Sequence, residues 1–197
     1  MSIANHPDGR MDDSDLIEHT VSSEPVFDGK LLHVRRDAVR MANGHEAVRE
    51  WIAHPGAVVV LGWLDNGKLL FERQFRYPLQ RIFVELPAGK IDPDEHPLDT
   101  AKRELREETG HQAKFWRHVA TMHPCIGYSD ERIEIFWASG LIYVGHQRDH
   151  GEFLEVIEMS VADSILAVRD GEITDGKTIT ALMWADKIAS GVWPVPE

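Results

Sequence analysis

The segment RELREETG, residues 103–110, places three glutamates and two arginines in eight residues and ends on a glycine. In a helix, residues three and four positions apart share a face, so Glu104, Glu107 and Glu108 would point the same way. Gathering like charges costs free energy unless something neutralises them. This segment therefore constrains both the local structure and what must lie beside it.

The residues around this segment predict a helix from about Pro97 to Thr109. Proline suits the first helical turn, Asp99 complements the positive end of the helix dipole, and Gly110 is the residue type that most often follows a helix C-terminus. The apolar residues of the segment fall on a neighbouring stripe, which we expect to pack on a core: Leu98, Ala101 and Leu105.

Two interpretations of the acidic face are open from the residues alone. In the first, the helix is a solvated amphipathic helix in which Arg103 pairs with Glu107. In the second, the carboxylates hold a hard divalent cation, and Mg²⁺ fits oxygen ligands better than zinc does. The preceding segment ELPAGKIDPDE supplies a loop with Gly89 and Glu95, and this context favours the metal site.

The complete pattern resembles the Nudix box of the Nudix hydrolases. It runs over residues 89–111 as Gly89, five residues, Glu95, seven residues and then RELREETG. Every fixed position of the box matches except the last, where His111 stands in place of an aliphatic residue or tryptophan. We interpret this difference as a packing variation outside the metal site.

The resemblance implies a role for each residue of the acidic face. Glu104 and Glu108 are the implied principal metal ligands, and the carbonyl of Ala88 often completes the coordination. Glu107 is implied as a further ligand or as a base that acts on the metal shell, while Arg103 orients the glutamates. The implied cofactor is Mg²⁺, with Mn²⁺ as a substitute.

Segments outside the box resemble the bacterial ADP-ribose pyrophosphatase group, from about Phe27 to Ala189. They include REWIAHPGAVVV and RQFRYPLQRIFVELPAGKID. In that group a front hairpin exchanges between subunits, which implies a homodimer with Arg49 and Glu50 on the partner-facing strand. Arg76 is implied near the substrate phosphates, where a planar guanidinium can hold a diphosphate bidentately. The alternative for each arginine is a plain surface charge.

The remaining candidate site residues lie in two further segments. One is a second acidic region, RDHGEFLEV, and the other is PCIGYSDE. By resemblance, Glu152 is the loop glutamate that acts as metal ligand or general base, whereas we expect Glu155 to form a structural ion pair. Glu131 is implied near the terminal ribose or the metal-bound water. Ile126 stands where the group has a proline that marks ADP-ribose specificity, a departure that concerns the substrate and leaves the metal chemistry intact.

The expected fold is α+β, the Nudix fold, with a mixed sheet between helices and an N-terminal β-hairpin extension used for dimerisation. We expect a tail over residues 1–20, the extension over 21–56 and the hydrolase domain over 57–197. Asn43-Gly44 and Asp65-Asn66-Gly67 predict hairpin turns, the second between GAVVVLGWL and KLLFERQFRYP. FWRHVATM and RIEIFWASGLIYV predict strands, the latter the final one, and VADSILAVRDG and TITALMWADKIASG predict helices.

The composition of the chain excludes several classes of binding partner. A net charge of −12 argues against a nucleic-acid or anionic-membrane surface. The single cysteine, Cys125, excludes an internal disulfide, and no apolar run approaches a membrane span. We therefore expect a cytoplasmic protein, and the resemblance implies that it acts on a small-molecule nucleotide.

The function that the acidic face and the resemblance together favour is metal-assisted attack of water on a nucleoside diphosphate linked to another group. ADP-ribose, cleaved to AMP and ribose 5-phosphate, is the first expected substrate, and a nucleotide sugar such as GDP-mannose is the alternative. A third hypothesis is a Nudix-fold module that senses a nucleotide without turning it over. The retention of Glu104, Glu107 and Glu108 argues against that hypothesis.

Overall fold

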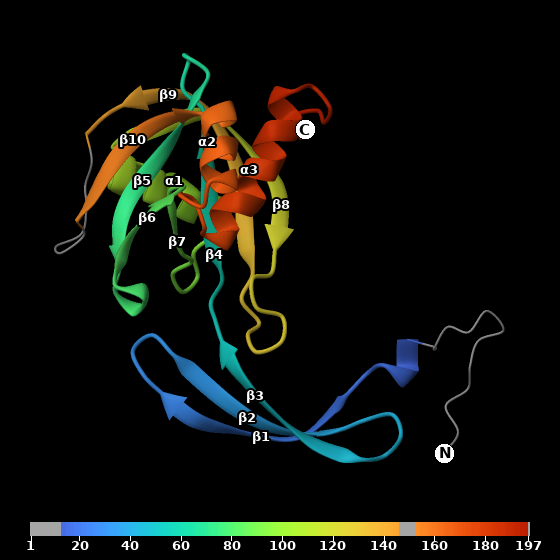
Figure 1. Ribbon diagram of the computed structural model, residues 1–197. Coiled ribbons are helices and arrows are strands. Elements are labelled where there is room, and N and C mark those ends of the chain that lie inside the picture. The colour runs from blue at the N-terminus through green and yellow to red at the C-terminus, as the bar shows by residue number, and fades with distance from the viewer. Residues whose placement is uncertain (1–12, 146–152, 197) are drawn as a thin grey trace. The chain divides into compact units, whose positions relative to one another are not determined.

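The computed structural model describes residues 13–145 and 153–196 and divides into two compact units (Figure 1). The first unit holds the described residues up to His54 together with residues 125–131. The second unit holds residues 55–124 and the described residues from 132 onwards. No helix within these described ranges has the length and apolarity needed to cross a membrane.

The first unit is a three-stranded antiparallel sheet in the order β1-β2-β3. It follows a short 3-10 helix, η1, and its elements are η1 Asp13–Asp15, β1 His19–Asp28, β2 His33–Arg40 and β3 Glu46–Ala53. Gly44 closes the turn between β2 and β3 with a positive φ of 84°, and its N–H donates to the Met41 carbonyl over 2.8 Å. The hairpin predicted around Asn43-Gly44 is therefore confirmed.

The strand β1 was not predicted, and it begins inside the segment expected to be a tail. All ten of its residues are exposed, so the sequence carries no alternation of buried and exposed positions that would mark a strand. Residues 1–12, the rest of the expected tail, lie outside the described residues.

The described part of the second unit carries two sheets and three α-helices. The four-stranded sheet has the order β7-β4-β9-β8, and the three-stranded sheet has the order β10-β5-β6. β4 and β9 run parallel while the other pairs are antiparallel, so the predicted mixed sheet is confirmed. The elements are β4 Ala57–Gly62, β5 Lys68–Arg76, η2 Tyr77–Leu79, β6 Arg81–Glu85, β7 Ala88–Lys90, α1 Pro97–Thr109, β8 His111–Met122, β9 Ile133–Tyr143, β10 Leu154–Ser160, α2 Val161–Arg169 and α3 Gly176–Ala189.

The hairpin expected between β4 and β5 is wrong, although the turn itself is present. Gly67 has a φ of 80° and donates to the Leu64 carbonyl, but the two strands share only the isolated bridge between Trp63 and Leu69. All six residues of β4 are buried, so this strand takes neighbours on both edges and cover on both faces. β5 instead joins β10, a strand that follows β9, so β9 is not the final strand as expected.

The core lies on both faces of β4, in agreement with the period of two in a strand. Val58 and Val60 pack in a cluster that includes Leu105 of α1. Val59 and Leu61 pack in a second cluster that includes apolar residues of α2 and α3. Figure 1 shows α2 beside α3, with α1 on the other face of the sheet, so the predicted sheet between helices is confirmed.

The helix α1 begins and ends as predicted. Pro97 occupies the first turn, and Gly110 follows the helix with a φ of 75°, from where its N–H donates to the Arg106 carbonyl over 2.9 Å. Ala101 and Leu105 are fully buried. The apolar stripe thus anchors α1 to the sheet and fixes where its acidic face points.

Leu105→Ala should destabilise the second unit by about 2–5 kcal/mol, because it removes a fully buried side chain and leaves a cavity between α1 and β4. Urea unfolding followed by circular dichroism measures this change. Leu166→Ala, at a position of α2 that is 46% exposed, is the matched control and should change the free energy of unfolding by under about 1 kcal/mol. Equal losses in the two variants would contradict the assigned packing of α1.

Candidate active site

The acidic face of α1 lies against the short strand β7. The N–H of Ala88 donates to Oε2 of Glu108 over 3.1 Å. A Cβ atom built on Gly89 would lie 2.0 Å from the carboxyl carbon of Glu104, so only a glycine lets the backbone approach this side chain so closely. The structure therefore brings Ala88, Glu104 and Glu108 together, as the sequence analysis expected.

Arg103 connects the acidic face to the loop before the helix. Its Nε and Nη2 donate to the two carboxylate oxygens of Glu95 over 3.0 and 2.9 Å. Its Nη1 donates to Glu104 over 2.7 Å and to Glu107 over 3.1 Å. The Arg103–Glu107 pair of the solvated-helix interpretation is thus present, but it is one contact in a network that also positions Glu104.

Two buried carboxylates meet at the centre of the site. Glu108 on α1 is 4% exposed and Glu72 on β5 is 2% exposed. Burial raises the pKa of Glu108 well above its usual range, and the charge of Glu72, a hydrogen bond with it and the charge of Glu104 raise it further. A carboxylate cluster of this kind becomes stable when a cation or a proton neutralises it.

The sequence analysis missed Glu72. The sequence did carry a signal for this residue. Glu72 follows directly on three apolar residues in LLFERQF, and the structure shows these three residues buried in β5. A charged residue within such a run is costly unless it has a partner, and this makes it a candidate for function.

The chemistry of the cluster fits a divalent cation. Its donors are carboxylate oxygens with the nearby backbone of β7, a set suited to hard cations such as Mg²⁺ and Mn²⁺. Within residues 13–145 and 153–196, no three His, Cys, Asp or Glu side chains already have the arrangement needed to hold a metal ion.

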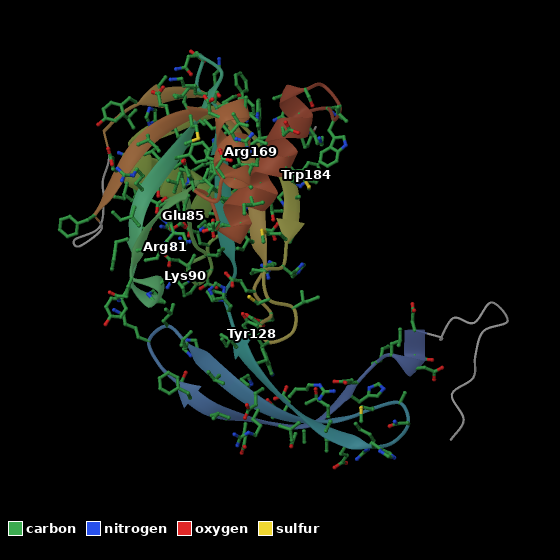
Figure 2. All side chains as sticks on the ribbon, viewed as in Figure 1. Arg81, Glu85, Lys90, Tyr128, Arg169 and Trp184 are labelled. Atoms are coloured by element: carbon green, nitrogen blue, oxygen red, sulfur yellow. The ribbon has the colours of Figure 1, made fainter. Side chains whose placement is uncertain are left out.

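Two basic side chains converge on a further buried carboxylate, Glu85, which is 3% exposed and is labelled with Arg81 in Figure 2. Arg76 donates from Nε and Nη2 to the two oxygens of Glu85 over 2.7 and 2.9 Å, and the ammonium of Lys177 also bonds Glu85. Burial raises the pKa of Glu85, but the bonds from Arg76 and Lys177 lower it below its usual range. Arg76 is therefore held in place by a carboxylate, and the sequence analysis predicted neither Glu85 nor Lys177.

Arg76 also interacts electrostatically with the acidic face of α1. Its pKa is raised first by the hydrogen bonds with Glu85, and the charge of Glu108 contributes to the increase. The guanidinium thus lies within electrostatic range of the carboxylate cluster, a position compatible with the expected contact to phosphates.

The other expected binding residues belong to the first unit. Arg49 and Glu50 lie on β3, where Arg49 bonds Glu18 over 2.9 Å and Glu50 accepts two bonds from Arg36. Both line a pocket of about 230 Å³ in the first unit, and the other lining residues are Trp51, Ile126, Gly127, Tyr128, Ser129 and Asp130. Tyr128 is labelled in Figure 2.

The loop over residues 125–131 is tied to β3 by backbone hydrogen bonds. The N–H of Ile52 donates to the Tyr128 carbonyl over 2.9 Å, and the N–H of Asp130 donates to the Ile52 carbonyl over 3.3 Å. Glu131 ends this loop with its carboxylate 3.8 Å from Nδ1 of His54. The structure thus groups Glu131 with His54, and its role toward a ligand stays a prediction.

The predictions for two residues of the second acidic region, Glu155 and Glu152, have different outcomes. Glu155 forms an ion pair with Arg73 at 2.5 Å, so its expected structural pairing is confirmed. Glu152, the expected general base, lies outside the described residues.

A family model described as the NUDIX domain matches residues 53–182, which include β7, α1 and the carboxylate cluster. The chain belongs to the Nudix family. A second model, described as the nucleoside diphosphate sugar hydrolase N-terminal domain, matches residues 18–52 of this Nudix hydrolase. The family resemblance stated from the box is thereby confirmed.

Relatives and a solved structure extend the comparison over most of the chain. The ADP-ribose pyrophosphatase of Bacillus subtilis (strain 168) is 39% identical over 171 residues, which cover 86% of this chain and 92% of that protein. The ADP-ribose pyrophosphatase of Mycobacterium tuberculosis (strain ATCC 25618 / H37Rv) is 35% identical over 175 residues, covering 87% and 84%. A crystal structure of an ADP compounds hydrolase shows the same fold, with a TM-score of 0.79, 21% identity and coverage of 90% and 97%.

Glu95 allows a test of the Arg103 network through pH. The hydrogen bond with Arg103 lowers the pKa of Glu95 to about 2, so the ionised carboxylate stabilises the fold fully above the unfolded pKa of about 4.3. This contribution is lost as the pH falls toward 2. Glu95→Gln should therefore reduce stability at pH 7 by about 1 kcal/mol, and the difference from wild type should shrink below pH 4.

Thermal unfolding from pH 7 to pH 2 measures this difference. Asp65→Asn is the control, because Asp65 is an exposed acid in the turn between β4 and β5. A difference between Glu95→Gln and wild type that does not depend on pH would contradict the ionised network.

Proposed function

We propose that this Nudix hydrolase cleaves the pyrophosphate bond of a nucleoside diphosphate derivative, with ADP-ribose as the first candidate and AMP and ribose 5-phosphate as products. The observation that carries the proposal is the meeting of Glu72, Glu104 and Glu108 beside β7, with Arg76 in electrostatic range. The relatives named ADP-ribose pyrophosphatase, matched over most of the chain, support the choice of substrate.

The proposed cofactor is Mg²⁺, with Mn²⁺ as a substitute, held by Glu104, Glu108 and the carbonyl of Ala88. When bound, a divalent cation supplies Lewis-acid stabilisation of the phosphate oxygens and makes a bound water more acidic. Arg103 holds Glu104 and Glu107 in their orientation through the contacts described above.

Other side chains of the chain would bind the substrate and move the proton. Arg76 presents a guanidinium to the diphosphate, whose oxygens gain negative charge as water attacks. Glu107 is a further ligand or a base. Glu152 is the proposed general base, and this role requires that it reach hydrogen-bond distance from the attacking water.

Arg49, Glu50 and Glu131 are the proposed substrate-binding residues outside the second unit. The pocket that Arg49 and Glu50 line supports this assignment, because it combines charged side chains with Trp51 and Tyr128, whose rings can stack on a base. The two charged residues can in turn hydrogen-bond a ribose or a base edge.

The same proposal makes the enzyme a cytoplasmic homodimer whose partners are small-molecule nucleotides rather than nucleic acid or membrane. The free thiol of Cys125 suits a reducing compartment, and the net charge of −12 would repel polyanions. Support for the dimer comes from the first unit, in whose described part Val39 is the one residue with a buried apolar side chain. Large apolar residues are exposed there instead: Val21, Val26, Phe27, Leu31, Leu32 and Val48.

One observation favours a second candidate, a nucleotide-sugar pyrophosphatase of the GDP-mannose type. Ile126 lines the pocket of the first unit, is 84% exposed, and replaces the proline expected for ADP-ribose specificity. An exposed aliphatic side chain at this point would change the shape offered to the sugar.

Release of phosphate monoesters tests the function on a panel of ADP-ribose, GDP-mannose, diadenosine polyphosphates and NADH, each with Mg²⁺ and with Mn²⁺. We expect the highest kcat/KM with ADP-ribose. A preference for GDP-mannose would establish the second candidate. Tight binding without turnover of any compound would instead show a nucleotide sensor and reject the hydrolase.

Glu108→Gln should lower turnover at least about a hundredfold, because the removed charge contributes several kcal/mol through the cation. The fold should persist, since glutamine keeps the shape of the side chain. Glu172→Gln, an exposed position after α2, is the control and should retain full activity. Near-normal turnover of the Glu108 variant, measured with saturating Mg²⁺, would reject the assignment of the metal site.

Placing charge on the exposed apolar residues of the first unit should break the dimer. Light scattering with size-exclusion chromatography should give wild type a mass of twice 22.4 kDa and the double variant Phe27→Asp/Val48→Asp a mass of 22.4 kDa. Asn43→Asp adds charge in the exposed turn and should remain dimeric. A fully active wild-type monomer would refute the proposed assembly.

A further inference from the structure

The N-terminus of α3 is fastened to the end of β6 by two neighbouring contacts. The N–H of Leu86 donates to Oγ1 of Thr178 over 3.0 Å, and Glu85 accepts from the ammonium of Lys177. Thr178 also donates to the capping carboxylate of Asp175 over 2.7 Å. Leu86 and Thr178 are almost fully buried, so this junction is a fixed point of the second unit.

Lys177 is unusually enclosed for a lysine. Its side chain is 15% exposed, and its ammonium contacts two carboxylates, Glu85 and Asp175, the latter over 2.9 Å. Enclosing a charged pair is costly, and removing one partner leaves the other charge without its counterion. An apolar or shorter residue would satisfy the packing of a helix N-terminus, so the docking of α3 does not by itself require a lysine here.

The partner that Lys177 shares is the residue that holds Arg76. Arg76 uses Nε and Nη2 for Glu85, and no bond from its Nη1 occurs among the described residues. Because a guanidinium is a rigid plane, fixing one edge on Glu85 determines the direction in which Nη1 points. The side chain of Arg76 is 42% exposed, which leaves part of it accessible to a ligand.

We propose that Lys177 is a positioning residue for Arg76: it holds Glu85 from the side of α3, so that Glu85 presents Nη1 of Arg76 to the substrate diphosphate. This inference rests on the proposed function, in which Arg76 binds the phosphates. Without Lys177, the carboxylate of Glu85 is bonded, among the described side chains, by Arg76 alone, so the two side chains can shift together and the guanidinium loses its single orientation.

A double-mutant cycle on ADP-ribose hydrolysis tests the route through Arg76. Lys177→Met should lower kcat/KM about tenfold, since small misplacements of a phosphate-binding group are costly. Lys177→Arg should restore it to within about threefold, because it preserves the charge. In an Arg76→Ala background, adding Lys177→Met should cost less than about twofold, as Lys177 then has nothing left to position.

Lys187→Met is the matched control on the same helix, where Lys187 is half exposed and pairs with Asp186. It should leave kcat/KM unchanged, and thermal unfolding should show each variant folded at the assay temperature. Losses that multiply in the double variant would mean that Lys177 acts independently of Arg76, and this outcome would overturn the proposal.

A measurement without substrate separates this proposal from the proposed function. The Nε–H of Arg76, bonded to a buried carboxylate, should give a resolved ¹⁵N–¹H signal with slow solvent exchange, assigned by its loss in Arg76→Lys. Lys177→Met should broaden this signal or speed its exchange, whereas Lys187→Met should not. An unchanged signal would overturn the positioning role even if the enzyme is active. An inactive wild type would reject the function and leave the signal to decide the positioning.

Discussion

The close approach of α1 to β7 is the constraint on which the rest of the site depends. It requires a glycine at position 89, where any Cβ would overlap the carboxyl group of Glu104, and it requires the buried stripe of Ala101 and Leu105 behind the helix. With both in place, carboxylates from a helix and a strand meet away from water. The high pKa of Glu108 is the electrostatic consequence of this packing.

The two arginines near the carboxylate cluster, Arg103 and Arg76, are held by the same kind of contact. Arg103 is gripped bidentately by Glu95, and Arg76 is gripped bidentately by Glu85. In each case a carboxylate outside the cluster fixes one edge of a guanidinium. Arg103 turns its remaining nitrogen to Glu104 and Glu107, while the remaining nitrogen of Arg76 makes no bond within the described part of the chain. The charge of the site is thereby arranged before any substrate arrives.

Structural features that depend on the spacing of neighbouring residues could be predicted from the sequence. The bounds of α1, the role of Gly110 and the shared face of Glu104 and Glu108 follow from positions close together in the chain, whereas the place of Ala88 beside them was implied by the family resemblance. Glu72 and Glu85 could not be placed in this way, because their importance comes from pairing with residues distant in sequence, such as Glu108 and Lys177. The separation of β4 from β5 was missed for a similar reason: a turn signal identifies the reversal of the chain, but sheet partners are selected by burial over the whole unit.

The loop over residues 125–131 is covalently part of the β8–β9 connection, yet its hydrogen bonds go to β3. The backbone groups of Tyr128 and Asp130 are satisfied by Ile52, more than seventy positions earlier in the chain. Shortening the protein to begin at residue 55 would therefore do more than discard a sheet. It would strip this connection of its backbone partners, so the catalytic half cannot be treated as an interchangeable module in protein engineering.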